Sequence, residues 1–362
     1  MRRVVEALTG LAGLAACCIT ISSVPVAQAQ QGGAGDSIRS IETAPLFSSQ
    51  ELLHFTLIAD LKQLKKDRSE DSEYRPVRIV LGTAGDTSRT LELKVKTRGV
   101  FRLQRRTCDF PPLLLNFPSE ATAGTVFDGQ DKVKLVTHCN QKRNEYEQYV
   151  IQEYLLYRIY NLLTEKSFQV RPAHITYVQV GDTQDSITKY GFLIEDEDQM
   201  AARNGAKILD VEGFHQYEMQ HDQMTLFSVF QYFIGNADWS VSALHNVKII
   251  LDERQNVPIA VPYDFDFAGA IDARYAAPPE ELGTGSVRDR VLISHCRTQE
   301  EFDRVFGLFR DRKDAVYDLY RNQLGLQEKY TRRALEYFDK FYETIDNPRA
   351  VRREFLRGCP RG

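Results

Sequence analysis

Short stretches in the first half of the chain alternate apolar with polar residues. Residues 77–81 and 91–95 both follow this alternation, and a glycine-containing segment separates them. Alternation of this kind is typical of strands with one buried face, and two such stretches around a turn predict a hairpin. Further strands are expected at 113–117, 133–135, 173–180 and 189–194, whereas 49–67 mixes strand and short-helix signals.

The period of the pattern changes at residue 144. Residues 144–163 contain neither Gly nor Pro, and their apolar positions recur at helical spacing, which predicts a helix of about five turns. Glu153 lies in the middle of the apolar face of this helix. A buried carboxylate is costly unless a cation pairs with it, so we expect a basic partner for Glu153. Helical spacing also dominates 224–235, 300–323 and 327–345.

The pattern therefore divides the chain into a β-rich half with one inserted helix and a mostly α-helical half. The acidic run 195–198 lies between them and is expected to be a solvated loop, with a hinge as the alternative. The chain is 43% hydrophobic and 27% charged, as in ordinary globular proteins. Its 46 Lys and Arg against 50 Asp and Glu give a net charge of −4, which argues against a general nucleic-acid binder.

The N-terminus has the features of an export signal. Arg2 and Arg3 precede a mostly apolar run over 7–26, and Ala27-Gln28-Ala29 follows as a small-x-small cleavage pattern. These features predict a signal peptide over 1–29 and an extracytoplasmic location, periplasmic or secreted. A membrane anchor and a lipoprotein with a lipid on Cys17 are the alternatives. After cleavage we expect no membrane-spanning segment, because no later run reaches about 18 apolar residues.

Export implies an oxidising compartment, in which cysteines form disulfides. The four cysteines beyond the leader allow three pairings, and we expect Cys108–Cys139 and, on weaker grounds, Cys296–Cys359. Zinc binding is the alternative. It is disfavoured because the sequence contains no Cys-x-x-Cys motif.

Candidate chemistry is concentrated between residues 234 and 269. Asp238 follows an apolar helix, Asn246 comes eight residues later, and a predicted hairpin leads from there to Asp264 and Asp266. Phosphoryl transfer from ATP uses parts of this kind: one Asp orients the acceptor hydroxyl, and an Asn and another Asp hold Mg²⁺. Each residue alone could equally cap a turn or pair with backbone.

The first half supplies residues that could hold phosphates. Lys134 lies on a predicted strand, and the helix that carries Glu153 follows it directly. A strand Lys paired with a helix Glu is one way to hold the α- and β-phosphates, so the two are expected to form an ion pair. The alternative for Lys134 is a lysine on an edge strand. Arg98 lies in the loop 97–99, whose single glycine does not make a P-loop.

These ordered pieces resemble the CotH-type kinase family, atypical secreted or spore-coat protein kinases. The similarity runs from about Leu91 to Ala270. It rests on Arg98-Gly99, the strand pair 177–180 and 190–195, Gly235-Asn236-Ala237-Asp238-Trp239, and the segment 262–269 with its Asp-x-Asp. The sequence departs from the family pattern after Arg98-Gly99, where the typical Ser residues are absent, and at Pro111-Pro112.

The resemblance implies an α+β, bilobal protein-kinase-like fold. Its β-rich N-lobe with one inserted helix would span 46–195 and its mostly helical C-lobe 196–350, with a flexible leader over 30–45 and a C-terminal tail over 351–362. ATP and Mg²⁺, or Mn²⁺, would be the cofactors. By carry-over, Asp238 would be catalytic, Asp264, Asp266 and Asn246 would bind the metal, and Lys134, Glu153 and Arg98 would bind the nucleotide.

The expected function is thus an exported CotH-like kinase that phosphorylates Ser or Thr of an exported protein. One alternative is a catalytically inactive binding or structural protein of the cell envelope. The other is a nucleotidyl transferase that uses the same metal site. Incorporation of label from γ- or α-labelled ATP distinguishes the three.

Overall fold

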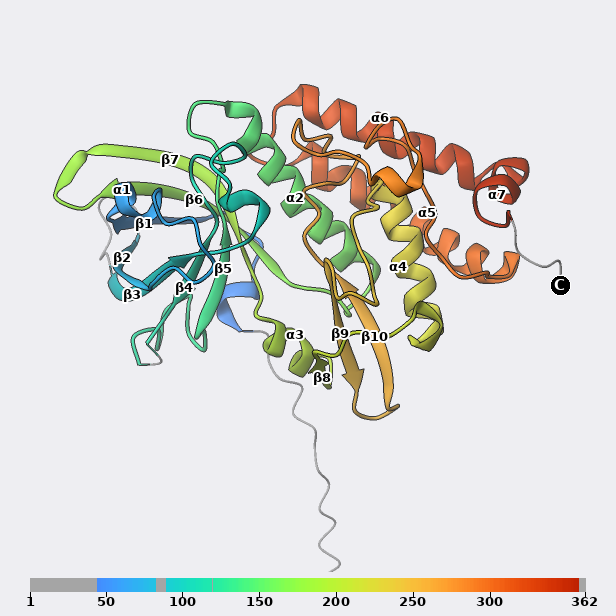
Figure 1. The fold of residues 1–362 in the computed structure, drawn as a ribbon, viewed down its shortest axis with the longest axis horizontal. Coiled ribbons are helices and arrows are strands. Elements are labelled where there is room, and N and C mark those ends of the chain that lie inside the picture. The colour runs from blue at the N-terminus through green and yellow to red at the C-terminus, as the bar shows by residue number, and fades with distance from the viewer. Residues whose placement is uncertain (1–43, 83–88, 119, 358–362) are drawn as a thin grey trace, which may run out of the picture. The chain divides into compact units, whose positions relative to one another are not determined.

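In the computed structural model, which describes residues 44–82, 89–118 and 120–357, seven strands form a closed barrel (Figure 1). Around the barrel the strand order is β1-β2-β3-β4-β5-β7-β6. The strands are β1 (Leu53–Ala59), β2 (Arg75–Leu81), β3 (Arg89–Thr97), β4 (Leu113–Asn116), β5 (Lys132–Val136), β6 (Val170–Gln179) and β7 (Asp182–Ile194). The hairpin expected at 77–95 is confirmed as β2 and β3.

The barrel closes through one parallel pair, β1 with β6, and all its other neighbours are antiparallel. In that pair Leu53 lies opposite Ala173, and the register continues to Ala59 opposite Gln179. Apolar side chains such as Leu57 and Ile79 are fully buried in the barrel core. Alternation along each strand thus places one face inside a shared core.

The expected α+β, bilobal protein-kinase-like fold with a β-rich N-lobe and a mostly helical C-lobe is wrong. The sheet is closed, and its closure depends on β1, in the region 49–67 where the sequence pattern mixed strand and helix signals. The β1–β6 pairing joins residues about 120 positions apart, and local periodicity carries no information about such a contact.

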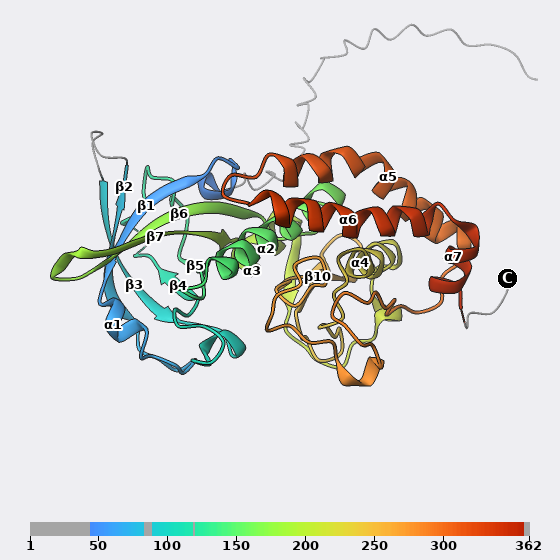
Figure 2. The same cartoon turned by 90° about the horizontal axis from the view of Figure 1, so that it is seen from above.

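Helix α2 (Asn144–Leu163) is buried on nearly all sides, and its bounds agree with the predicted 144–163. It contacts β6 and β7 on one side and α5 (Gln299–Arg321) on another. Figure 2 shows it between the barrel and the later helices. This position explains why the buried residues of α2 are spread over more than one face of the helix. Two of them, Glu153 and Tyr157, line the cavity described below.

The second half contains a three-stranded antiparallel sheet and most of the helices. The sheet order is β10-β9-β8, with β8 at Ala206–Leu209, β9 at Val247–Asp252 and β10 at Val257–Pro262. The remaining helices are α1 (Leu61–Leu64) beside the barrel, then α3 (Glu197–Arg203), α4 (His221–Ile234), α6 (Glu328–Ile345) and α7 (Pro348–Glu354). Among the described residues, no helix has the length and apolar character needed to cross a membrane.

The acidic run 195–198 is not a solvated loop, contrary to expectation. Glu195 is buried and accepts a hydrogen bond from Arg203 Nη2 at 2.9 Å. Asp196 caps α3 by accepting the backbone N–H of Asp198, and Glu197 opens that helix. Glu195 and Asp196 therefore each have a specific partner, and only Asp198 of the run is exposed.

The disulfide Cys108–Cys139 is present, as expected from the sequence. It joins the segment before β4 to the segment after β5. The second expected pair includes Cys359, which lies outside the described residues, as do the signal peptide, Cys17 and nearly all of the leader.

Candidate functional site

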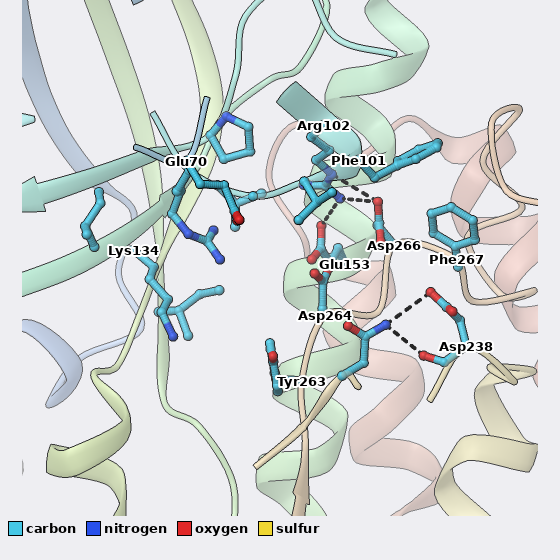
Figure 3. A pocket seen from close by; sticks show the side chains of 18 of the residues that line it. Glu70, Phe101, Arg102, Lys134, Glu153, Asp238, Tyr263, Asp264, Asp266 and Phe267 are labelled. Atoms are coloured by element: carbon cyan, nitrogen blue, oxygen red, sulfur yellow. Dashed lines mark hydrogen bonds and ion pairs between the residues drawn. The ribbon is translucent and has the colours of Figure 1, made fainter. Parts of the chain in front are cut away.

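A single cavity of about 490 Å³ brings together every site residue expected from the sequence (Figure 3). Its walls come from β3, β4 and β5, from α2, and from the loops that follow α4 and β10. The expected residues that line it are Arg98, Lys134, Glu153, Asp238, Asn246, Asp264 and Asp266.

The β9–β10 hairpin places Asn246 and Asp264 next to each other. Val247 pairs with Pro262, and the N–H of Tyr263 donates to the carbonyl of Asn246 at 3.1 Å, so both side chains emerge at the open end of the hairpin. Both residues have left-handed backbone, with φ of 53° for Asn246 and 60° for Asp264. Strain of this kind is concentrated at functional sites in proteins. The N–H of Asp264 also donates to the hydroxyl of Tyr157 on α2, at 2.8 Å.

Gly235 turns the chain from α4 into the loop that carries Asp238. It caps α4 with φ of 67°, and a Cβ at this position would collide with the hydroxyl of Tyr337. After this turn, Asn236 Oδ1 accepts the N–H of Asp238 at 3.1 Å. In the Gly-Asn-x-Asp segment, Gly235 therefore ends α4 and packs closely against Tyr337, and Asn236 holds the backbone of Asp238 by a hydrogen bond.

Two side chains hold the carboxylate of Asp238 from different sides. Asn246 Nδ2 donates to Asp238 Oδ2 at 3.1 Å and to the Asp238 carbonyl at 2.7 Å. His245 Nε2 lies 2.9 Å from Asp238 Oδ1. Sequence reasoning did not identify His245 as a partner of Asp238, and its only signal was its position beside Asn246. The contacts leave Asp238 half-buried, with its position fixed.

A buried ion network forms the inner end of the cavity (Figure 3). Arg102 Nη2 lies 2.6 Å from Glu153 and 3.0 Å from Asp266, and all three side chains are at least 90% buried. Phe101 packs edge-on against Phe267 at 5.1 Å, which brings the two loops together. The expected need of Glu153 for a cation is thus confirmed, but the cation is Arg102.

The expected ion pair between Lys134 and Glu153 is wrong. Lys134 Nζ lies 3.5 Å from Glu197 at the start of α3, and Lys248 Nζ lies 3.0 Å from the same carboxylate. The edge-strand alternative is also wrong, because β5 lies between β4 and β7 in the barrel. Burial lowers the pKa of Lys134, and the nearby Arg98 lowers it further.

Two carboxylates contact one guanidinium in this network, and a third, Asp264, adds its charge nearby. Burial raises the pKa of Glu153 against the attraction of Arg102, and Asp266 and Asp264 contribute in the same direction. Burial likewise raises the pKa of Asp266 to about 6, with the charge of Asp264 adding to the shift. An excess of carboxylate over cation makes additional positive charge favourable at this wall.

The opposite wall carries positive charge. Lys96 and Arg98 line it, and neither forms an ion pair with any residue that the structure describes. Lys96 Nζ donates to the carbonyl of Glu70 at 3.2 Å. The barrel side of the cavity is therefore net cationic, with Lys96, Arg98 and Lys134 against Glu70, and the side supplied by α2 and the loops beyond it is mostly acidic.

Asp264 and Asn246 are the residues best placed to hold a metal. In 44–82, 89–118 and 120–357 no group of three or more His, Cys, Asp or Glu side chains is arranged to bind one. Mg²⁺ usually takes only one or two protein carboxylates and completes its shell with phosphates and water. The donor set is compatible with that mode, and Asp266 is committed to Arg102.

Comparison with family models and with curated proteins identifies no relative. No family model matches the chain, and no curated protein matches its sequence. The resemblance to CotH-type kinases therefore rests on the motifs themselves, and the roles it implies for Asp238, Asp264 and Asn246 stay predictions.

Proposed function

We propose that the protein transfers the γ-phosphoryl group of ATP to a hydroxyl group with the help of Mg²⁺. The observation that supports this proposal is the division of one 490 Å³ cavity into a cationic wall and an acidic wall with Asp238, Asn246 and Asp264. A nucleoside triphosphate with its divalent cation matches both walls, because phosphates suit the cationic side and the cation suits the acidic side.

In this proposal Lys96 and Arg98 attract the phosphates from the barrel side. Asp264 and Asn246 Oδ1 supply oxygen ligands, and Asn246 Nδ2 is already directed at Asp238. Bound Mg²⁺ would neutralise charge on the transferred phosphoryl group. Arg102 keeps Glu153 and Asp266 in place behind these ligands and compensates part of their charge.

Asp238 is proposed to orient the acceptor hydroxyl and to receive its proton. Asn246 and His245 hold its carboxylate, so the direction from which an acceptor hydroxyl can approach the carboxylate is fixed. The side chain of Asp238 is 33% exposed, so an acceptor can reach it from solvent. We propose Ser or Thr of an exported protein as the acceptor, and an extracytoplasmic location that is compatible with the Cys108–Cys139 disulfide.

Isotope transfer tests the proposal directly. Mature protein is incubated with Mg²⁺ and either γ-labelled or α-labelled ATP, with a mixture of unfolded exported proteins as acceptor. We expect γ label in protein, and a loss of about a hundredfold or more in Asp238→Asn and in Asp264→Asn. Asp311→Asn, an exposed aspartate on α5, is the matched control and should behave as wild type.

The two rival functions give other outcomes. Incorporation of α label would indicate nucleotidyl transfer. Absence of both labels, together with an unchanged melting temperature in the presence of ATP and Mg²⁺, would contradict the proposal and favour a catalytically inactive binding protein.

A further inference from the structure

Two histidines lie side by side on the outer surface of the barrel. His54 on β1 is directly opposite His174 on β6, in the parallel pair that closes the sheet. Their strand neighbours Phe55, Ala173 and Ile175 are buried, whereas His54 is exposed and His174 is half-buried. Because alternate residues of a strand face opposite sides of a sheet, both imidazoles lie on the face away from the barrel core. Neither residue lines the 490 Å³ cavity, and the proposed function uses neither.

The separation of the two imidazoles suits a shared metal ion. Their ring centroids lie 5.5 Å apart, and the ring planes meet at 88°. In a tetrahedral zinc site the metal lies about 2 Å from each imidazole nitrogen, so two such rings have centroids about 5 Å apart. The observed spacing therefore needs only a small adjustment, which the exposed side chain of His54 can make by rotation of its ring.

Both imidazoles are available as ligands. In the described part of the chain, neither ring forms a hydrogen bond or an ion pair, and their contacts are with other rings. The ring of Tyr190, opposite His174 on β7, lies 4.4 Å from the His174 ring. Burial lowers the pKa of His174, and the nearby His54 lowers it further against the attraction of Glu147. At neutral pH His174 is therefore uncharged, and the neutral imidazole is the form that binds metals.

The surroundings limit the site to two protein ligands. The charge of Glu147 acts on His174, but this carboxylate already accepts the backbone N–H of Tyr190 at 2.7 Å and lies 3.4 Å from Lys189 Nζ. Over 44–82, 89–118 and 120–357, no third His, Cys, Asp or Glu joins the pair in a metal-binding group. Imidazole nitrogen favours zinc, copper and nickel over the hard ions Mg²⁺ and Ca²⁺, so a pair of histidines selects a transition metal.

We propose that His54 and His174 together bind one divalent transition-metal ion, with zinc as the simplest case, on the outside of the barrel. Water completes the coordination shell of the ion. The two ligands lie about 120 positions apart in the sequence and meet only when β1 pairs with β6, so the ion binds the folded chain much more tightly than the unfolded one. It therefore stabilises the pairing that closes the barrel, whether or not the chain transfers phosphate.

A zinc titration tests the proposal. Zn²⁺ is titrated calorimetrically into the mature protein without an affinity tag, with excess Mg²⁺ present to occupy oxygen ligands. We expect saturable binding of one zinc per chain. His54→Gln and His174→Gln should each weaken this binding about a hundredfold, because a two-point attachment becomes a single one. His221→Gln, which removes an exposed imidazole beside Glu301, is the matched control and should bind zinc as the wild type does.

Thermal unfolding gives a second measurement. Added Zn²⁺ should raise the melting temperature of the wild type and of His221→Gln, but not that of His54→Gln or His174→Gln. Melting curves without zinc show that each variant is folded. The inference is overturned if the wild type takes up no zinc saturably, or if either His54→Gln or His174→Gln binds zinc as the wild type does. Because neither measurement uses ATP, the result is independent of the labelling experiment.

Discussion

At the scale of single residues, the arrangement around Arg102 decides the electrostatics of the cavity. Its guanidinium contacts Glu153 from α2 and Asp266 from the loop after β10, so one side chain joins three parts of the chain. Burial alone would lower the pKa of Arg102, but Asp266 and Glu153 raise it well above its usual value. Arg102 is therefore permanently charged and compensates two buried carboxylates.

Replacing Arg102 should destabilise the fold strongly. Arg102→Met leaves Glu153 and Asp266 buried without a cation, and removal of one partner from a buried ion pair typically costs about 3–5 kcal/mol. Urea denaturation measures the free energy of unfolding. Arg310→Met is the matched control, because Arg310 pairs with Asp346 at the surface, and we expect a loss below about 1 kcal/mol. Equal losses in both variants would contradict the role of Arg102.

At the scale of elements, three short connections bring the site together. The end of α4 delivers Asp238, the β9–β10 hairpin delivers Asn246 and Asp264, and the short 3-10 helix Phe101–Leu103 after β3 delivers Arg102. The helix end and the hairpin were both expected from the sequence, since a period change and a turn signal mark them locally. Arg102 was not expected, because its partners lie 51 and 164 residues away.

Gly235 tests how tightly the α4 connection is fitted. In Gly235→Ala the left-handed backbone costs about 1–2 kcal/mol, and the new methyl group also collides with the Tyr337 hydroxyl. Gly205→Ala is a matched control, since Gly205 has a similar φ of 63° but nothing within 4 Å of the added Cβ. We expect the loss of unfolding free energy to be larger in Gly235→Ala. Tyr337→Phe in the same chain should restore part of the difference.

At the scale of the whole molecule, the sequence predicts what depends on local pattern and misses what depends on long-range pairing. The helix at 144–163 was predictable because its apolar spacing is continuous. The closed barrel was not predictable, because it requires β1 to pair with β6. The partner of Lys134 was also missed, because Glu197 belongs to the short helix α3, and the acidic run that contains it was interpreted as a loop. The candidate site residues lie together because local motifs place polar residues at the end of α4 and at the open end of the β9–β10 hairpin. The fold then brings these ends to one cavity.

The barrel core contains a histidine that links its stability to pH. His138 is fully buried beside Phe110, with ring centroids 4.8 Å apart, and neither ring nitrogen has a partner among the described residues. Burial lowers the pKa of His138 to about 3, and the charges of Lys189 and Lys65 act in the same direction. The folded state therefore keeps His138 neutral where the unfolded chain would bind a proton.

The consequence is a loss of stability in acid that one substitution should reduce. Because the folded pKa lies below the unfolded value of about 6.5, the contribution of His138 is complete above pH 6.5 and declines as pH falls toward 3. Between pH 7 and pH 5 it should amount to about 2 kcal/mol. His138→Phe removes the titrating ring but fills the space, so urea unfolding at both pH values should show a smaller difference than in wild type. His295→Phe, at an exposed position, is the control and should change the difference less than His138→Phe does. If His138→Phe and wild type lose the same free energy between pH 7 and pH 5, acid sensitivity originates elsewhere in the fold.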